Sequence, residues 1–308
     1  MRVLFFGTPE FAVPSLTALV GEGFDIVGVV TRADKPTGRH RSSLTASPVK
    51  LAALAEELTV LQPEKPSAEA FLEAARALKP DISVVVAYGH ILKPDLLAVP
   101  RLGSVNVHAS LLPKLRGAAP IERAILEGFA ETGVTIMQMD AGMDTGPILH
   151  QVSTPIASDE TGGELRIRLA EVGALALVEA LTLLDETGLA PKPQLEAEAT
   201  YAPKLTRAEE QIDWLQDAEL VARKIRAFDP APGAWTNCRG KAIKLFEGRK
   251  VAEGSAKPGT VLAAGETLRV ACGTGATEAC EVQPEGKARM PVRAFVNGRG
   301  VAVGDALG

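Results

Sequence analysis

The sequence predicts an α/β protein in which a Rossmann-like domain with a mostly parallel sheet is followed by a small OB-like β-barrel domain. Three observations lead to this prediction. Strand and helix patterns alternate through the first two-thirds of the 308 residues, which is typical of a parallel sheet with helical crossovers. Short strand patterns fill most of the last third. The length also exceeds the usual size of one domain.

The alternation begins with a strand at residues 2–7, whose continuous apolar run predicts burial on both faces. Serine caps and first-turn prolines mark helix starts in the segments that follow. These segments are a helix at 9–20, a strand at 25–30, a helix from Ser47-Pro48, a helix capped by Ser67 and ending at Leu78, and a strand at 81–88.

A strand at residues 104–112 carries the first polar groups that suggest chemistry. In its SVNVH segment, valines alternate with Asn106 and His108, which predicts a half-buried strand. Residues two apart on a strand point to the same side, so the amide and the imidazole leave one face together. Asp144 follows the strand pattern at 134–139, in a turn that Gly142 and Gly146 favour.

These three side chains fit acyl transfer to an amine. Asn106 supplies a donor for a developing oxyanion, His108 carries protons, and Asp144 orients and charges the imidazole. Each residue alone also has a structural interpretation: a strand-end amide, a buried histidine and a turn former. Their combination favours function.

The pattern changes in the last third of the chain. A long apolar helix at 160–184 belongs to the core of a first domain at 1–187, and the loosely patterned stretch at 188–205 is interpreted as a linker. The second domain spans 206–308. Its predicted elements are a helix at 206–228 and strands at 234–238, 241–246, 259–264, 267–272 and 278–282.

Long strings along almost the whole chain resemble the family of formyltransferases that use 10-formyltetrahydrofolate, in particular members that act on methionyl-tRNA. The strings include LFFGTPEFAVPSL, VVVAYGHIL, LGSVNVHASLLPKLRGAAPIERAI, ETGVTIMQMDAGMDTGPIL and IRAFDPAPGAW. The resemblance implies transfer of a formyl group to the α-amino group of methionine on initiator tRNA, for translation initiation.

By position, the resemblance implies a catalytic role for Asn106, His108 and Asp144. The folate-binding residues it implies are Ser110, Leu111, Leu112 and Pro113, and we expect Tyr88, Gly89, Ile91 and Leu92 to line the pteridine pocket as well. Ala109 stands where the family more usually has glycine, which adds one methyl group to the folate loop.

Charge favours an RNA partner. Residues 203–308 carry about +3, whereas residues 1–202 carry −8, and a basic face can bind phosphates. A basic insertion at 34–43 lies between a strand and a helix and is expected to be a mobile loop. The tRNA-binding residues predicted from these two regions are Lys35, Arg39, Arg41, Arg223, Lys224, Lys241 and Lys244.

Several other classes of protein are disfavoured. The three cysteines lack C-x-x-C spacing, which disfavours disulfides and zinc, and no metal is expected. The G-x-G-x-x-G and G-x-x-x-x-G-K-[ST] motifs are missing. The sequence carries no membrane-length apolar run and no signal pattern, so we expect a cytoplasmic protein, with a monomer favoured.

Two alternatives remain open from the residues. A formyltransferase with another amine acceptor, such as a sugar nucleotide or glycinamide ribonucleotide, would have the same three site residues. A non-catalytic RNA-binding protein would keep the fold without turnover, although the intact Asn106, His108 and Asp144 argue against it.

Overall fold

The computed structural model describes residues 1–37, 43–252 and 256–308, which form two units. The first unit comprises Met1–Gly117, Thr132–Thr154 and Ile167–Tyr201. The second comprises Ala118–Glu131, Pro155–Arg166 and Ala202–Gly308. Residues 118–131 and 155–166 therefore belong to the same unit as the C-terminal residues, although they come much earlier in the sequence.

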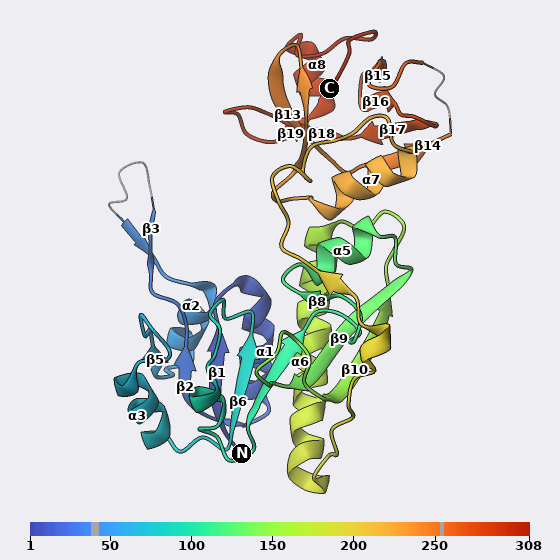
Figure 1. Ribbon diagram of the computed structural model, residues 1–308. Helices are drawn as coiled ribbons and strands as arrows, with labels where there is room; N and C mark the ends of the chain where they lie inside the picture. The colour runs from blue at the N-terminus through green and yellow to red at the C-terminus, as the bar shows by residue number, and fades with distance from the viewer. Residues whose placement is uncertain (38–42, 253–255) are drawn as a thin grey trace. The chain divides into compact units, whose positions relative to one another are not determined.

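A seven-stranded sheet in the order β10-β9-β7-β6-β1-β2-β5 forms the centre of the first unit (Figure 1). Its strands are β1 (Arg2–Gly7), β2 (Asp25–Val30), β5 (Val60–Leu61), β6 (Ile82–Val86), β7 (Ser104–His108), β9 (Glu131–Gln138) and β10 (Ile148–Pro155). Neighbouring strands in the run β7-β6-β1-β2-β5 are all parallel, and β9 runs antiparallel to β7. The predicted mostly parallel sheet is thus confirmed.

Helices cover both faces of this sheet, and alternate side chains of β1 contact the helices on opposite faces. Leu4 and Phe6 pack with Phe71 of α3 (Glu69–Ala77) in one apolar cluster. On the other face, a Cβ at Gly7 would meet Ala12 and Val49, beside α1 (Val13–Gly21) and α2 (Pro48–Ala55). The sheet is the middle of three layers.

Several predicted boundaries shift. The helix expected at 9–20 is divided into a 3-10 turn, η1 (Glu10–Ala12), and α1. Ser47 caps α2 by accepting the Lys50 N–H, as predicted. Ser67 does not cap α3, because it lies in a turn closed by the Ala68 N–H and the Lys65 carbonyl, and Ala68 takes the cap position.

The remaining elements that precede α7 (Ala218–Ala227) in the chain lie outside the central sheet. They are β3 (Lys35–Thr37), β4 (Ser43–Thr45), α4 (Pro94–Leu97), β8 (Arg116–Gly117), α5 (Pro120–Leu126), α6 (Gly162–Thr187), η2 (Glu196–Glu198) and β11 (Tyr201–Ala202). β3 and β4 pair antiparallel at the base of the basic insertion. Among the described residues, no helix combines the length and apolarity needed to cross a membrane.

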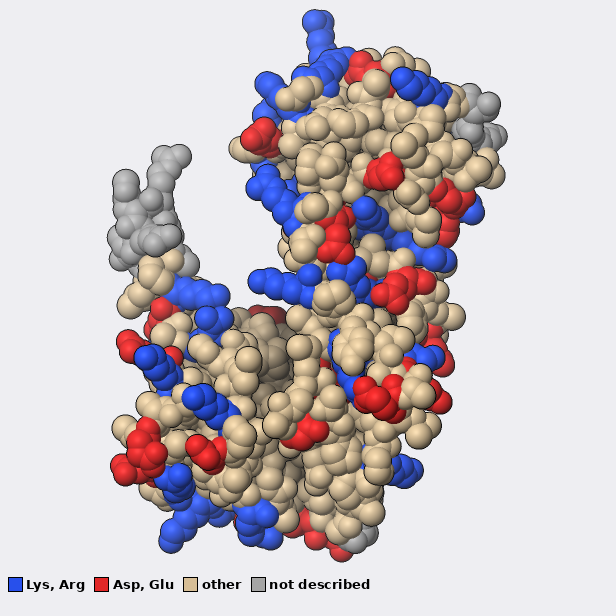
Figure 2. Space-filling model, viewed as in Figure 1, with Lys and Arg blue, Asp and Glu red and all other residues tan. Residues whose placement is uncertain are grey.

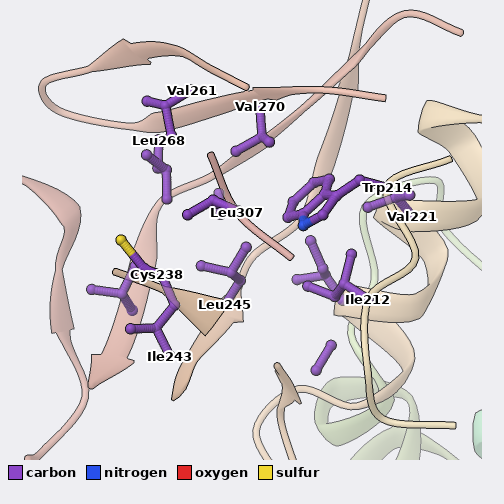
Figure 3. Packing of buried hydrophobic residues seen from close by; sticks show 14 of the residues in the cluster. Ile212, Trp214, Val221, Cys238, Ile243, Leu245, Val261, Leu268, Val270 and Leu307 are labelled. Carbon is purple, nitrogen blue, oxygen red and sulfur yellow. The ribbon is translucent and has the colours of Figure 1, made fainter. Parts of the chain in front are cut away.

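The second unit contains two four-stranded antiparallel sheets, in the orders β12-β13-β18-β19 and β14-β17-β16-β15. The elements are α7 (Ala218–Ala227), β12 (Ala234–Cys238), β13 (Lys241–Phe246), β14 (Arg249–Val251), β15 (Val261–Ala264), β16 (Leu268–Ala271), β17 (Ala276–Ala279), β18 (Glu281–Pro284), β19 (Met290–Pro291) and α8 (Val292–Asn297). Their inner side chains form one core, in which Trp214, Leu245 and Val270 take part (Figure 3). A C-terminal domain of antiparallel strands is therefore confirmed.

Two predicted elements in this unit were wrong. The helix at 206–228 is reduced to α7, because Ile212 pairs with Trp235 and Trp214 enters the core. The strand at 278–282 is two strands, because the chain passes at Cys280 from β17 in one sheet to β18 in the other.

Glu209 secures the turn that begins at Thr206, between β11 and α7. Its carboxylate accepts the N–H and hydroxyl of Thr206 and lies 2.7 Å from Nη1 of Arg123. These hydrogen bonds, the one from Arg123 first, lower the pKa of Glu209 from 4.5 to about 2.

We expect Glu209→Gln to lower the free energy of unfolding by less than about 1 kcal/mol at pH 7, since the pair is partly exposed. The folded pKa is depressed, so this stabilisation is present above about pH 4.5 and is lost as the pH falls toward 2. Urea unfolding of both proteins at pH 7 and pH 3 measures it. If the free energies of unfolding of wild type and Glu209→Gln differ by the same amount at pH 7 and pH 3, the low pKa assigned to Glu209 is contradicted.

Candidate active site

Strand β7 presents the two polar residues singled out in the sequence on one side of the sheet. Asn106 is in register with Val85 of β6, which is in turn in register with Phe6 of β1, so these residues share the face that α3 covers. Val107 points the other way, where a Cβ at Gly173 of α6 would lie 3.0 Å from it. Asn106 and His108 therefore leave the face opposite α6, as predicted.

The strand itself is more deeply buried than its alternating pattern suggested. Ser104, Val105, Val107 and His108 are all buried, and only Asn106 is half-buried. The prediction of a half-buried strand is wrong, because α6 packs on the Val107 side of β7 and the segments at Leu115 and Asp144 cover His108 on the other side. Among the described residues, the Asn106 side chain has no hydrogen-bond partner.

His108 is held between a carbonyl and a carboxylate. His108 is 5% exposed, and its Nε2 lies 3.0 Å from the Leu115 carbonyl oxygen. A carbonyl only accepts, so Nε2 carries the hydrogen. Nδ1 lies 3.7 Å from Oδ2 of Asp144. The ring is thus oriented by Leu115, and its second nitrogen faces the negative charge.

Asp144 reaches this position from an unusual backbone conformation. Its φ is +56°, in the left-handed region, and its Oδ2 accepts the Gly117 N–H at 2.8 Å. The turn closes tightly, because a Cβ at Gly146 would lie 1.9 Å from the Gln138 carbonyl oxygen. The structure therefore brings Asp144 to His108, as the sequence predicted.

Two residues that the sequence did not single out hold this turn. Gln194 donates from Nε2 to the carbonyls of Asp144 (2.8 Å) and Gly146 (2.7 Å). Its Oε1 accepts from Nε and Nη2 of Arg116, which is 1% exposed. Gln194 lies in a stretch without a helix or strand pattern, so nothing in the sequence indicated that it would bind this turn.

The predicted folate loop packs against β9 and β10. Thr135 donates to the Ser110 carbonyl and accepts the Leu112 N–H, and Gln151 donates to the Leu112 carbonyl. Ser110 and Leu112 are buried, whereas Leu111 and Pro113 are half-buried. The Leu112–Pro113 peptide bond is cis. The loop has a defined shape directly beyond His108.

The segment after β6 is divided between core and surface. Tyr88 and Leu92 belong to the apolar cluster around Phe6, and burial raises the pKa of Tyr88 to about 12. Their side chains therefore support the sheet. Gly89 (φ +85°) and Ile91, which is 93% exposed, lie at the surface, as do Ala87 and His90.

A hydrogen-bond network fastens the start of the basic insertion. Lys50 of α2 donates to Asp34 (2.7 Å) and Gln62 (2.8 Å), and Gln62 donates to Asp34. The bonds from Lys50 and Gln62 lower the pKa of Asp34. Lys35 follows as an exposed residue of β3. Arg39 and Arg41 lie outside the described residues.

The lysine and arginine side chains of the second unit that are predicted to bind tRNA differ in whether they already have a partner within the protein. Arg223 pairs with Glu219 at 3.0 Å, and Lys224 donates to the Gln211 carbonyl at 2.8 Å. Lys244 donates to the Pro232 carbonyl at 2.6 Å. Lys241 is exposed and forms no ion pair within the described part of the chain. Part of the predicted basic face is thus already bound within the protein.

The fold and site define the class of protein. An amide and an imidazole at the carboxyl end of a parallel strand, with a carboxylate beside the imidazole, are a polar constellation where open α/β sheets place their ligands. Within the described ranges, no three His, Cys, Asp or Glu side chains gather to hold a metal. Residues 1–181 match the formyl transferase family model, and residues 204–300 match the model of its C-terminal domain.

Two similar proteins show to which family of formyl transferases the chain belongs. Methionyl-tRNA formyltransferase of Thiobacillus denitrificans is 49% identical over 314 residues and covers 100% of both chains. That of Symbiobacterium thermophilum is 50% identical over 99% of this chain and 94% of its own. The chain belongs to the methionyl-tRNA formyltransferase family and is a formyl-transferring enzyme.

Solved structures share the fold. A methionyl-tRNA formyltransferase of Clostridium thermocellum matches with a TM-score of 0.56 at 15% identity, over 82% of this chain and 94% of that one. HypX of Aquifex aeolicus in complex with tetrahydrofolic acid matches at 0.67 and 22% identity, over 97% of this chain and 47% of that one. A sugar N-formyltransferase is among the similar folds too.

Proposed function

We propose that the protein transfers the formyl group of 10-formyltetrahydrofolate to the α-amino group of methionyl-initiator tRNA in the cytoplasm. The observation that carries the mechanism is the His108–Asp144 pair beside Asn106. The near-complete match to methionyl-tRNA formyltransferases supports the acceptor.

Asn106 is the proposed oxyanion donor. When the amine attacks the formyl carbon, the formyl oxygen becomes negative, and a positioned amide N–H stabilises it. The free side chain of Asn106 is available for this role, whereas Nε2 of His108 already donates to the Leu115 carbonyl.

His108 and Asp144 are the proposed proton-transfer pair. With the hydrogen of the neutral ring on Nε2, Nδ1 is the atom that accepts the proton of the attacking amine, directly or through water. The Asp144 carboxylate stabilises the imidazolium formed. The carbon–nitrogen bond to the donor then breaks, and the proton goes to the departing nitrogen. No covalent enzyme intermediate is needed.

The folate co-substrate fits the surface next to these groups. The loop of Ser110, Leu111, Leu112 and Pro113 begins two residues after His108 and is hydrogen-bonded to Thr135. Gly89 and Ile91 would add backbone and apolar contact at the end of β6, since both are exposed. The loop and these two residues would hold the pteridine, and the formyl carbon would be supplied beside Asn106.

A transfer assay with labelled 10-formyltetrahydrofolate tests the proposal. Initiator Met-tRNA, elongator Met-tRNA and an amino-sugar nucleotide are offered in parallel, and label is followed. We expect label on initiator Met-tRNA alone. Label on the sugar nucleotide alone would keep the chemistry and exclude the tRNA acceptor, and no label on any acceptor would contradict the enzyme function.

A further inference from the structure

The outer face of the sheet β12-β13-β18 carries an aromatic side chain among polar ones. Trp235 is directly opposite Lys244, and Lys244 is opposite Gln283, so the three lie in one row across the strands. All three are half-buried. Their neighbours Thr236 and Ile243 point into the core. The row therefore faces away from the core of this unit.

A pocket of about 270 Å³ lies over this row and adds Arg207 and Glu285 to its walls. Arg207 is placed there by backbone pairing: the Trp235 N–H donates to the Glu210 carbonyl, and the Ile212 N–H donates to the Trp235 carbonyl. The Glu209 turn fixes the same segment. We call Arg207, Trp235, Lys244, Gln283 and Glu285 the Trp235 platform.

Arg207 and Lys244 can both bind a ligand, since Lys244 donates only one of its three N–H groups, to the Pro232 carbonyl. Arg207 is exposed and forms no ion pair with any residue in the described ranges. By contrast, Arg226 and Arg289 are held by carboxylates within the unit. Figure 2 shows lysine and arginine side chains along the side of this domain where Figure 1 labels β13 and β19. Glu285 is the single carboxylate in the pocket wall.

This combination matches the chemistry of an unpaired nucleotide. A base can stack on an aromatic ring, and its phosphate can bind nearby cations. Gln283 and Glu285 present amide and carboxylate groups, which can bond to a base edge. We propose that the Trp235 platform binds an unpaired nucleotide of the tRNA by stacking its base on Trp235, with its phosphate on Arg207 and Lys244. The inference rests on the proposed function and locates an RNA contact in the second unit.

Intrinsic fluorescence gives a direct readout, because the chain has two tryptophans. Trp214 is in the core, where its Nε1 donates to Thr236, so Trp235 is the one that a base can reach. Titration with tRNA is expected to quench the wild-type signal. The quenching is expected to be lost in Trp235→Phe, although that variant still binds.

The affinity of the following variants for tRNA distinguishes base stacking on Trp235 from attraction between charges alone. Trp235→Ala is expected to raise the Kd for tRNA about tenfold, which is within the usual worth of one base–aromatic stack, whereas Trp235→Phe stays within about threefold of wild type. Arg207→Ala is expected to weaken binding and to flatten its salt dependence. Arg293→Ala, which removes an exposed charge on α8, is the matched control.

An assay of Met-tRNA formylation distinguishes a failure of the platform proposal from a failure of the proposed function. If Trp235→Ala binds tRNA as wild type does while the wild type formylates Met-tRNA, the platform proposal fails and the proposed function stands. If the wild type formylates no tRNA, the proposed function fails. Equal losses in Trp235→Ala and Trp235→Phe, with both variants melting as wild type, would also overturn the stacking proposal.

Discussion

Replacing Asn106 with alanine is expected to lower kcat about 10²- to 10³-fold, which is the usual cost of removing one oxyanion donor. Asn106 is the half-buried residue of a strand that is otherwise buried, and its side chain has no partner in the described part of the chain. The fold therefore gains little from this amide, and its loss falls on the chemistry. The Kd for initiator tRNA is expected to stay within about twofold.

Asn106→Asp is the matched variant, because it keeps the size of the side chain and removes its donor. We expect it to be as slow as Asn106→Ala or slower, since a negative charge would face the developing oxyanion. Single-turnover rates at saturating co-substrate and tRNA measure the effect. A variant with normal turnover and weakened tRNA binding would show that Asn106 is a binding residue.

The sequence predicted the parts of the site that depend on local pattern. The alternation in SVNVH placed Asn106 and His108 on the same side of β7, and the glycines around Asp144 predicted a turn. Local pattern could not show what orients the imidazole. Leu115 does so through a backbone carbonyl, which every residue has.

Long-range contacts explain the remaining differences. Gln194 binds a turn about fifty residues away, and no periodicity marks such a contact. The strand predicted at 278–282 has a continuous pattern, yet Cys280 is where the chain changes sheets. Likewise, the pattern of β7 could not show that both faces of the sheet are covered. In each case, tertiary packing decided what local preference left open.

Asp144→Asn is expected to slow formyl transfer by about 10²- to 10⁴-fold, the range that a positioned proton-transfer group supplies. Asparagine is nearly the same size, and its oxygen can still accept the Gly117 N–H that Oδ2 accepts now. The turn should therefore remain folded. What is lost is the negative charge 3.7 Å from Nδ1 of His108, and with it the stabilisation of the imidazolium.

Asp140→Asn is the control from the same turn. Asp140 accepts from the Thr145 hydroxyl and the Gly142 N–H, so this change perturbs the turn without removing the charge beside His108. We expect its activity to stay within a few-fold of wild type. Equal losses in the two variants would show that the shape of the turn matters and the charge does not.

A double-mutant cycle tests whether Asp144 acts through the imidazole. His108→Ala is expected to slow transfer at least as much as Asp144→Asn, since it removes the group that carries the proton. If the carboxylate works only by stabilising that group, then His108→Ala combined with Asp144→Asn is no slower than His108→Ala alone, because residues that act as a unit are not additive. Fully additive losses would instead mean that Asp144 has a role of its own, such as holding the water that moves the proton.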